Sequence, residues 1–346
     1  MKTFDEVFVD KTKYGVKVQT SEYGKSGIHI IVDQGQSQIA GYTDREDGLF
    51  KEVPAIVFGD HTRVIKYVNE PFFLGADGLK VLRSKDENAN YKYLYYALKN
   101  AKIPDTGYNR HFKWLKKIQI EYPDSNEQAK IVKILDEASY IISKKKAEIQ
   151  ALDNLIKARF VEMFSGTYEE VLAENVCSEI VDCPHSTPKY DEEKLIYPAI
   201  RTSEIQNGTI FWSSMKYVGI VEYEKRTKRL KPAGGDIIYA REGTYGDCVI
   251  LPNENKFCLG QRTMLFRPDY KICTSAYLHT ALRSDSVKKQ ADESNAGSTV
   301  PHVNVADAKK FHFPLPPMEL QQQFSDFVRA TDKSKVVSEA EYYLTP

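Results

Sequence analysis

Residues 124–165 read DSNEQAKIVKILDEASYIISKKKAEIQALDNLIKARFVEMFS and contain neither glycine nor proline. Pro123 stops the strand expected before this stretch, and Asp124 or Ser125 can cap the first turn of a helix. Gly166 follows as a helix terminator. The stretch therefore predicts one uninterrupted helix of about 40 residues, which at 1.5 Å per residue would form a rod roughly 60 Å long.

Apolar residues recur along this helix at alternating intervals of four and three residues, with charged residues around them. A seam this narrow is typical of a coiled coil, and no domain of this chain is large enough to bury so long a rod as an ordinary core helix. Lys145 and Arg159 interrupt the seam at two of its positions. The apolar seam positions are Ile131, Leu135, Ala138, Ile142, Ile149, Leu152, Ile156 and Met163.

A second helix, predicted to begin at Met318, is the expected partner of the first. Its pattern weakens after Thr331, so we expect it to be the shorter of the two. The unpaired part of the first helix would then expose an apolar surface, which we expect a partner protein or a second copy of this chain to cover. The seam residues expected to be uncovered are Ile149, Leu152, Ile156 and Met163. The matching residues of the second helix are Leu320, Phe324, Phe327 and Val328.

Two halves of the chain repeat one another. YKYLYYALKN (91–100) matches SAYLHTALRS (275–284), and AIVFGD (55–60) matches DIIYAR (236–241). Each half alternates short β-branched and aromatic runs with turn signals, and each is followed by a proline that precedes a helix. A repeat this long indicates domain duplication, with an α+β body in each half and specificity in its loops.

Composition excludes several classes of protein. Apolar residues make up 42% and aromatic residues 12%, which favours a globular chain. No run approaches about 18 uninterrupted apolar residues, and the first residues lack the apolar core of a signal peptide, so we expect a cytoplasmic protein with no membrane partner. The five cysteines fit no zinc pattern. Cys177, Cys183 and His185 could be imagined as metal ligands, but the cysteines are interpreted as reduced residues in packed positions, and no metal or cofactor is expected.

Charge is balanced overall, with 48 basic and 48 acidic residues, but it is unevenly distributed. YNRHFKWLKK (108–117) carries four basic residues and no acid, and EKRTKRLK (224–231) is a second basic cluster. Zero net charge is weak evidence against DNA binding, because phosphate neutralisation dominates affinity. Basic patches in both halves nevertheless suit a polyanion that is contacted twice, although charge runs of this kind are usually solvated faces.

Several loop residues are of the types that read DNA. Arginine to guanine, and glutamine or asparagine to adenine, are the favoured two-bond pairings, and hydroxyl side chains can add phosphate contacts. Each candidate has a structural alternative: Arg241 could pair with Glu242 or another carboxylate, and Gln261 could satisfy backbone groups. The candidates of the first half are Arg63, Tyr108, Arg110, His111 and Lys113. Those of the second half are Arg241, Thr244, Gln261, Arg262, Ser298, Thr299, His302 and Asn304.

Catalytic motifs find little support. NEPF (69–72) differs from the Asn-Pro-Pro-Tyr signature of adenine methyltransferases, because Glu70 stands in place of a proline and no glycine-rich cofactor loop lies upstream. GKS (24–26) resembles the end of a phosphate-binding loop, but Gln19 stands where a glycine is needed. We therefore expect a non-catalytic chain. A scaffold that binds only protein through its coiled coil remains the alternative, which the Arg- and Gln-rich loops disfavour.

Both bodies and both helix starts resemble the specificity subunits of type I restriction-modification systems. In the first half the resemblance rests on GYNRHFK (107–113) and on Pro123 with the Glu-Gln pair that follows it. In the second half it rests on DCPHSTP (182–188), GDIIYAREG (235–243), GSTVPH (297–302) and PLPPMELQ (314–321). It covers nearly the whole chain, and the order of its elements is more specific than any single motif.

The resemblance implies an α+β fold with two similar target recognition domains joined by long antiparallel coiled-coil helices. The first recognition domain would span residues 1–122 and the central long helix 123–166. The second recognition domain would span 167–314, and a shortened C-terminal helix 315–346. Each domain would read one half of a split site in double-stranded DNA, and the helices would act as a ruler for the spacer.

The resemblance also implies partners. Two modification subunits, which carry S-adenosylmethionine and methylate adenine, would dock on this chain. Restriction subunits with nuclease and ATP-driven translocase activity would join them, and self-association through the helices is a further option. The shortened second helix departs from the family pattern. It leaves open the alternative of a truncated or recombining specificity cassette whose assembly is impaired.

Overall fold

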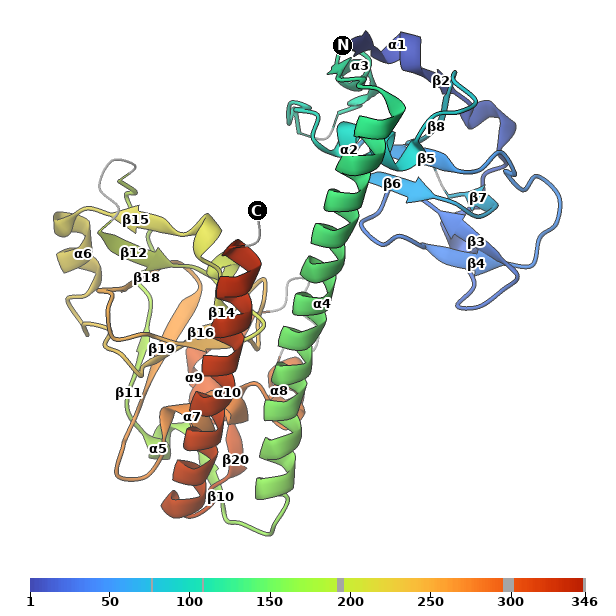
Figure 1. Cartoon of the computed structure of the whole chain (residues 1–346). Coiled ribbons are helices and arrows are strands. Elements are labelled where there is room, and N and C mark those ends of the chain that lie inside the picture. Colours follow the sequence, from blue (N-terminus) through green and yellow to red (C-terminus); the bar gives the residue numbers. More distant parts are fainter. Residues whose placement is uncertain (76, 108, 192–195, 295–301, 345–346) are drawn as a thin grey trace. The chain divides into compact units, whose positions relative to one another are not determined.

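The computed structural model describes residues 1–346 except 76, 108, 192–195, 295–301 and 345–346, and from residue 334 it describes only the backbone (Figure 1). The chain divides into two compact units, residues 1–143 and 144–345. The division falls inside the long helix α4 (Ser125–Phe164), whose first half belongs to unit 1 and whose second half belongs to unit 2. The domain boundaries expected from the sequence lay instead at the two ends of this helix.

Unit 1 is built on a four-stranded antiparallel sheet with the order β2-β8-β5-β6. A three-stranded sheet, β4-β3-β7, stands beside it and contains a parallel pair, β3 with β7. The strands are β1 (Lys2–Thr3), β2 (Phe8–Asp10), β3 (His29–Val32), β4 (Gly41–Thr43), β5 (Ala55–Gly59), β6 (Ile65–Val68), β7 (Phe72–Leu74), β8 (Leu79–Ser84) and β9 (Gln119–Ile120). The helices are α1 (Phe4–Val7), α2 (Tyr91–Lys99) and α3 (Phe112–Leu115), with short 3-10 turns at Thr12–Tyr14 and Thr20–Glu22.

Unit 2 repeats this plan. Its four-stranded sheet has the order β11-β19-β16-β17, and its three-stranded sheet, β15-β12-β18, again contains one parallel pair. The strands are β10 (Glu170–Leu172), β11 (Cys177–Asp182), β12 (Tyr197–Ile200), β13 (Ile205–Gln206), β14 (Thr209–Ile210), β15 (Lys216–Val218), β16 (Ile237–Ala240), β17 (Cys248–Ile250), β18 (Cys258–Leu259), β19 (Thr263–Pro268) and β20 (His312–Pro314). The helices are α5 (Ala173–Val176), α6 (Ile220–Arg226), α7 (Ser275–Leu282), α8 (Asp285–Ser294), α9 (Val305–Lys309) and α10 (Met318–Leu344), with 3-10 turns at Thr202–Glu204 and Trp212–Ser214.

The duplication predicted from the sequence is therefore present in the topology. Strands β2, β8, β5 and β6 correspond in sheet order to β11, β19, β16 and β17, and the pair β1–β9 corresponds to β10–β20. The motifs that matched in the sequence form equivalent elements, because residues 91–100 and 275–284 contain helices α2 and α7. The two α+β bodies and the long helix confirm the expected fold class.

The predicted seam of α4 is visible in its exposure pattern. All eight apolar seam residues, and also Lys145 and Arg159, are half-buried, whereas most of their neighbours are exposed. Ile131 packs into the core of unit 1, and Ile156 and Met163 pack into the core of unit 2. The expectation that Ile156 and Met163 lie uncovered is therefore wrong, because the body of unit 2 and α10 cover them.

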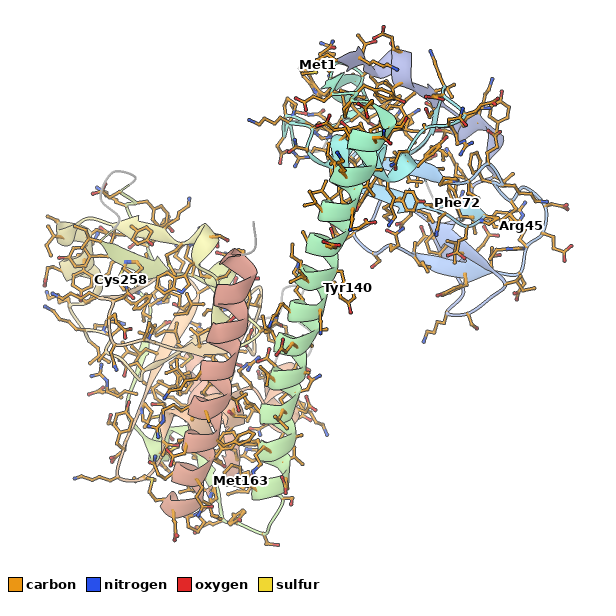
Figure 2. The ribbon with its side chains drawn as sticks, viewed as in Figure 1. Met1, Arg45, Phe72, Tyr140, Met163 and Cys258 are labelled. Atoms are coloured by element: carbon orange, nitrogen blue, oxygen red, sulfur yellow. The ribbon has the colours of Figure 1, made fainter. Side chains whose placement is uncertain are left out.

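Helix α10 is the antiparallel partner of the second half of α4 within unit 2 (Figure 1). Phe324 lies 5.5 Å from Phe160 and 5.4 Å from Phe164, measured between ring centroids, and the guanidinium of Arg159 lies 5.9 Å from the ring of Phe327. Met163 lies in the same region (Figure 2). Helix α10 continues to Leu344, beyond the predicted weakening at Thr331, although with 27 residues it is shorter than α4 with 40.

A buried glutamine stands near the start of each long helix. Gln128 is 5% exposed and its side chain donates to the carbonyl of Pro123 at 2.9 Å. Gln321 is fully buried and donates to the carbonyl of Pro316 at 2.9 Å, and its side-chain oxygen accepts from the backbone of Thr274 at 3.0 Å. Each side chain donates to a carbonyl of the loop before its helix and so ties the helix start to that loop.

The cysteines are packed residues, as the sequence suggests. Cys183, Cys248, Cys258 and Cys273 are buried, and Cys177 is half-buried. Burial raises the pKa of Cys258 and of Cys273 to about 12, so both stay as neutral thiols at physiological pH. Within the described residues, no group of three potential ligands could hold a metal ion. None of the helices described combines the length and apolar character that crossing a membrane requires.

Candidate nucleic-acid interface

Three loops meet at one end of each four-stranded sheet. In unit 2 they are the β16–β17 turn (241–247), the segment before β19 (260–262) and residues 302–304 before α9. The backbone N–H of Arg241 donates to the carbonyl of Arg262 at 2.9 Å, and that of Val303 donates to the carbonyl of Arg241 at 3.0 Å. These bonds join the three loops into one surface, which we call the unit 2 loop face.

Unit 1 has the same arrangement. Its loops are the β5–β6 turn (60–64), the segment before β8 (75–78 without 76) and residues 109–111 before α3. The N–H of Asp60 donates to the carbonyl of Gly78 at 2.6 Å, and the N–H of His111 donates to the carbonyl of Asp60 at 2.8 Å. These are the counterparts of the two bonds in unit 2. We call this surface the unit 1 loop face.

A charged network underlies the unit 2 loop face. Arg241, which is 6% exposed, forms an ion pair with Asp182 at 2.5 Å and donates to the carbonyl of Val303 at 2.8 Å. Its second terminal nitrogen lies 2.9 Å from Nε2 of His302. Because arginine only donates, this ring nitrogen accepts, and the proton of a neutral His302 is on Nδ1.

The network continues outward through Glu242. One carboxylate oxygen of Glu242 lies 2.8 Å from Nδ1 of His302, and the other forms an ion pair with Nη1 of Arg262 at 2.6 Å. The Glu242 side chain is 17% exposed, whereas that of Arg262 is 64% exposed. The chain of contacts from Asp182 to Arg262 therefore runs from the interior of unit 2 to its surface.

The predicted residues of the second half gather on this face, but not all reach its surface. Thr244 donates to the carbonyl of Thr202 at 2.9 Å, and Gln261 donates to the carbonyl of His185 at 3.1 Å. Gln261 thus satisfies a backbone group, which was its structural alternative. Asn304 is exposed and lies 3.3 Å from Asp307. Ser298 and Thr299 lie outside the described residues.

The predicted residues of the first half are divided in the same way. Arg110 and Lys113 are exposed. Arg63 is held by an ion pair with Asp105 at 2.7 Å and by the carbonyl of Ile103 at 3.4 Å. Tyr108 lies outside the described residues.

The side chains of His111 and Arg241, both predicted to contact DNA, are buried in the structure. His111 is 1% exposed, with Nδ1 at 3.1 Å from the carbonyl of Asp60 and Nε2 at 3.2 Å from the hydroxyl of Thr106. Arg241 is equally enclosed by Asp182, Val303 and His302. Both side chains hold loops together inside the protein, because buried polar groups need such partners.

Replacing Arg241 by alanine is expected to lower the free energy of unfolding of unit 2 by about 2–3 kcal/mol, because it removes charge-assisted hydrogen bonds and leaves Asp182 without its arginine partner. Urea unfolding followed by circular dichroism measures the loss. Arg329→Ala is a matched control, because its guanidinium pairs with Asp326 on an exposed face and its side chain is 70% exposed. Equal stability of both variants would contradict the structural role of Arg241.

Two arginines adopt left-handed backbone conformations, Arg63 with φ of 61° and Arg262 with φ of 64°. Such a conformation costs a residue with a Cβ atom about 1–2 kcal/mol, and glycine adopts it freely. The sequence carries no signal for this feature, because turns with positive φ are expected at glycine and asparagine. Both arginines lie on a loop face.

The two basic stretches are partly exposed. Arg110, Lys113, Lys116 and Lys117 of the first stretch are all exposed. In the second, Arg226 is 5% exposed and donates to the carbonyls of Leu259 at 2.9 Å and Ser186 at 3.0 Å. Arg226 therefore ties the 184–186 loop to β18, and the exposed basic residues of this stretch are Lys225, Lys228, Arg229 and Lys231.

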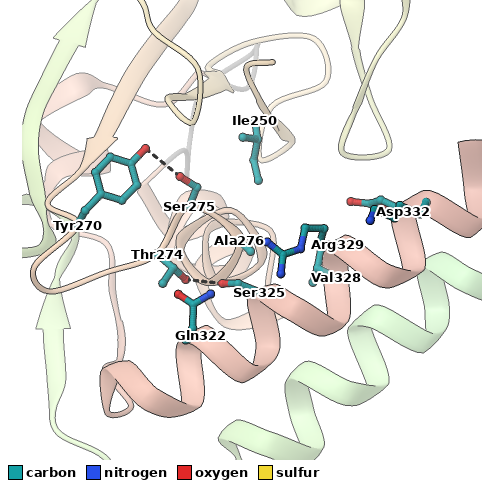
Figure 3. Close-up of a pocket in the computed structure, with 11 residues that line it drawn as sticks. Ile250, Tyr270, Thr274, Ser275, Ala276, Gln322, Ser325, Val328, Arg329 and Asp332 are labelled. Carbon is teal, nitrogen blue, oxygen red and sulfur yellow. Dashed lines mark hydrogen bonds between the residues drawn. The ribbon is translucent and has the colours of Figure 1, made fainter. Parts of the chain in front are cut away.

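Two cavities of unit 2 lie along its helices. One, of about 870 Å³, opens between α7 and α10, where the hydroxyl of Ser325 donates to Thr274 at 3.0 Å (Figure 3). The other, of about 800 Å³, is lined by Ile156 and Phe160 of α4 and by Trp212. Neither is lined by a residue of the unit 2 loop face, so these cavities belong to the helix packing.

Comparisons with known proteins agree with this architecture. The specificity subunit of the type I restriction enzyme EcoR124I/EcoR124II of Escherichia coli is 30% identical over 151 residues, which are 40% of this chain and 37% of that relative. The crystal structure of the S subunit of a type I restriction-modification system from M. genitalium matches 99% of this chain and 92% of its own with a TM-score of 0.58. Its sequence identity is 16%, so this likeness shows the fold alone.

A family model covers nearly the whole chain. The model of the type I restriction modification DNA specificity domain matches residues 2–152 and 178–341. The two matched segments correspond to the two repeated bodies and include most of both long helices. The chain belongs to the family of type I restriction-modification DNA specificity domains.

Proposed function

We propose that this chain is the DNA-reading subunit of a type I restriction-modification complex and that it recognises a bipartite site in double-stranded DNA. The observation that carries the proposal is the duplication of the loop face. Equivalent loops, joined by equivalent backbone hydrogen bonds, stand at the same end of the same sheet in each unit. Two reading surfaces in one chain suit a site in two halves.

The DNA contacts of this proposal come from the exposed polar residues of the loop faces. Arg110 and Lys113 in unit 1, and Arg262 and Asn304 in unit 2, have side chains that solvent reaches. Tyr108, Ser298 and Thr299 lie outside the described residues, and we propose them as DNA contacts from their positions in the sequence. The buried His111 and Arg241 would instead position these loops, and Thr244, Gln261, His302 and Arg63 would act at the edge of the contact.

The long helices would set the distance between the half-sites. Joining two reading surfaces makes the second contact effectively intramolecular, so only half-sites at one spacing and one helical phase are bound together. In this proposal the chain itself catalyses nothing, acts in the cytoplasm, and directs the adenine methylation of two modification subunits and the cleavage by restriction subunits.

Exposed apolar residues on α4 support a role for this helix in binding partner subunits. Ile134 and Tyr140 are 62% and 68% exposed, and Leu155 and Val161 are 49% and 65% exposed. Tyr140 projects away from the helix (Figure 2). Apolar side chains exposed in this way on a helix are typical of protein contacts.

The test is the adenine methylation pattern of DNA from cells that express this chain together with its modification subunit. We expect one bipartite motif with a fixed spacer, which disappears when this chain is omitted. A stable complex that adds no methylation would contradict the proposal and would favour a specificity cassette whose reading function is lost. Methylation that persists without this chain would show that the modification subunit reads DNA alone.

A further inference from the structure

We infer that Arg262 is a specificity-determining residue of unit 2 and that it reads a guanine through the edge of its guanidinium that carries Nε and Nη2. The inference rests on the proposed function, because it names one base contact within the DNA interface. It starts from a difference between the two units at a single backbone position.

The register of the sheets identifies the equivalent positions. Gly59 opposes Leu79 at the end of the β5–β8 ladder, and Ala240 opposes Thr263 at the end of the β16–β19 ladder. The residues before Leu79 and Thr263 are Gly78, with φ of 92°, and Arg262, with φ of 64°. The carbonyl of each accepts the hydrogen bond that joins two loops of its face. Unit 1 thus has glycine, and unit 2 has arginine, at the same left-handed position.

At the position of the other left-handed arginine, Arg63, the two units differ in the opposite sense: unit 1 has arginine and unit 2 has glycine. The N–H of Arg63 donates to the carbonyl of Gly59 at 2.8 Å, and the N–H of Gly246 donates to the carbonyl of Ala240 at 3.3 Å. Gly246 has φ of 85°, so it occupies in unit 2 the place of Arg63 in unit 1. In both cases the fold accepts glycine, and an arginine side chain is present at the expense of backbone strain.

The surroundings of the two arginines separate their roles. The guanidinium of Arg63 is bound on two sides, by Asp105 and by the carbonyl of Ile103, so it serves to hold the 103–105 segment. Arg262 is 64% exposed, and among the described residues Glu242 is its ion-pair partner. A surface ion pair of this kind stabilises too little to offset a strained backbone, so the side chain has a use outside the protein.

The geometry of the pair indicates that use. Glu242 binds Nη1 of Arg262 and is itself fixed by His302. The guanidinium is thereby oriented, and its Nε and Nη2 donors form a two-bond edge. This edge matches O6 and N7 of guanine, the pairing that arginine forms most often with a base edge in the major groove. Glu242 is a positioning residue in this arrangement.

The test uses Arg262→Gly, which replaces the side chain with the residue that unit 1 has at this place. Because glycine relieves the strain, the variant is expected to unfold at the same temperature as the wild type or higher. In complex with the modification subunit, its methylation motif is expected to lose one guanine in one half-site and keep every other position. Affinity for the original site should fall about 5- to 150-fold, because one base contact made through two hydrogen bonds contributes an affinity difference of this size.

Two further variants complete the design. Asn207→Gly places a glycine at a left-handed position outside the loop face, φ of 53° in the β13–β14 turn, and should leave the motif unchanged. Glu242→Gln keeps the size of the positioning side chain but removes its charge, and it should weaken discrimination at the same base position as Arg262→Gly while other positions stay intact. That readout would not change if Glu242 had only a structural role.

The outcomes are distinguishable. An unchanged motif with Arg262→Gly would overturn the inference, and so would an equal loss of affinity for all sequences, which would mean a phosphate contact. Failure of the wild-type complex to produce any bipartite motif would instead refute the proposed function. A variant that unfolds at a clearly lower temperature would show that Arg262 is retained for folding and would also overturn the inference.

Discussion

Replacing Phe324 by alanine is expected to lower the free energy of unfolding of unit 2 by about 3–5 kcal/mol, the usual loss for a buried phenylalanine. Its side chain is fully buried and its ring contacts both Phe160 and Phe164 of α4. These two rings in turn pack on Tyr277 of α7, at 5.5 Å and 5.0 Å. The substitution would therefore open a cavity where α4, α10 and the body of unit 2 meet.

Urea unfolding followed by circular dichroism measures this loss, and Phe327→Ala is the matched control. Phe327 lies on the same helix but is only half-buried, beside Arg159. We expect its replacement to cost less than half as much as that of Phe324. Similar small losses in both variants would mean that the aromatic cluster does not hold α10 to unit 2.

Deleting residues 144–150 from α4 is expected to shorten the spacer of the recognised DNA site by about three base pairs. Seven residues correspond to roughly 10 Å of helix, and one base pair rises 3.4 Å. The intervals of four and three residues along the seam are kept, because one full heptad is removed. Both half-sites should be read unchanged, while affinity for the original spacing should fall by about 100-fold or more, because the two contacts can no longer be made together.

The methylation motif of the variant shows whether this holds. The deletion also removes Lys144, Lys145 and Lys146, so the control replaces these three residues by alanine and keeps the length of the helix. The control should keep the original spacer. If the deletion variant also kept it, the helix would not set the distance between the half-sites.

The sequence predicts the features that depend on local periodicity. The seam of α4 follows from residue spacing alone, and each predicted seam residue is half-buried in the structure. The duplication could also be found, because residues 91–100 and 275–284 share a sequence pattern and each forms a helix on the four-stranded sheet of its own unit. The apolar pattern of the last helix fades after Thr331, whereas helix α10 continues to Leu344.

The charged network of unit 2 could not be predicted, because it joins residues that are distant in the sequence. Asp182 and Arg241 are brought together by the sheet order β11-β19-β16. The sequence suggested Glu242 or another carboxylate as a partner of Arg241; the partner is Asp182, and Glu242 pairs with Arg262 and His302. The burial of His111 could not be predicted for a related reason: it stands in a basic, polar stretch, yet its side chain is buried beside the carbonyl of Asp60.

The buried glutamines at the helix starts bear on which lengths of α4 are permissible. Gln128 ties the start of α4 to the loop before it, and Ile131 one turn later packs into the core of unit 1, so the rotation of α4 about its own axis is fixed there. Gln321 fixes α10 in the same way in unit 2, through Thr274 and Ile272. With both rotations fixed, one inserted residue would turn everything beyond it by about 100° while lengthening the rod by 1.5 Å. A heptad returns to within about 20° of the starting angle. The length of α4 can therefore change only in steps of seven residues, and the spacer length of the recognised DNA changes with it.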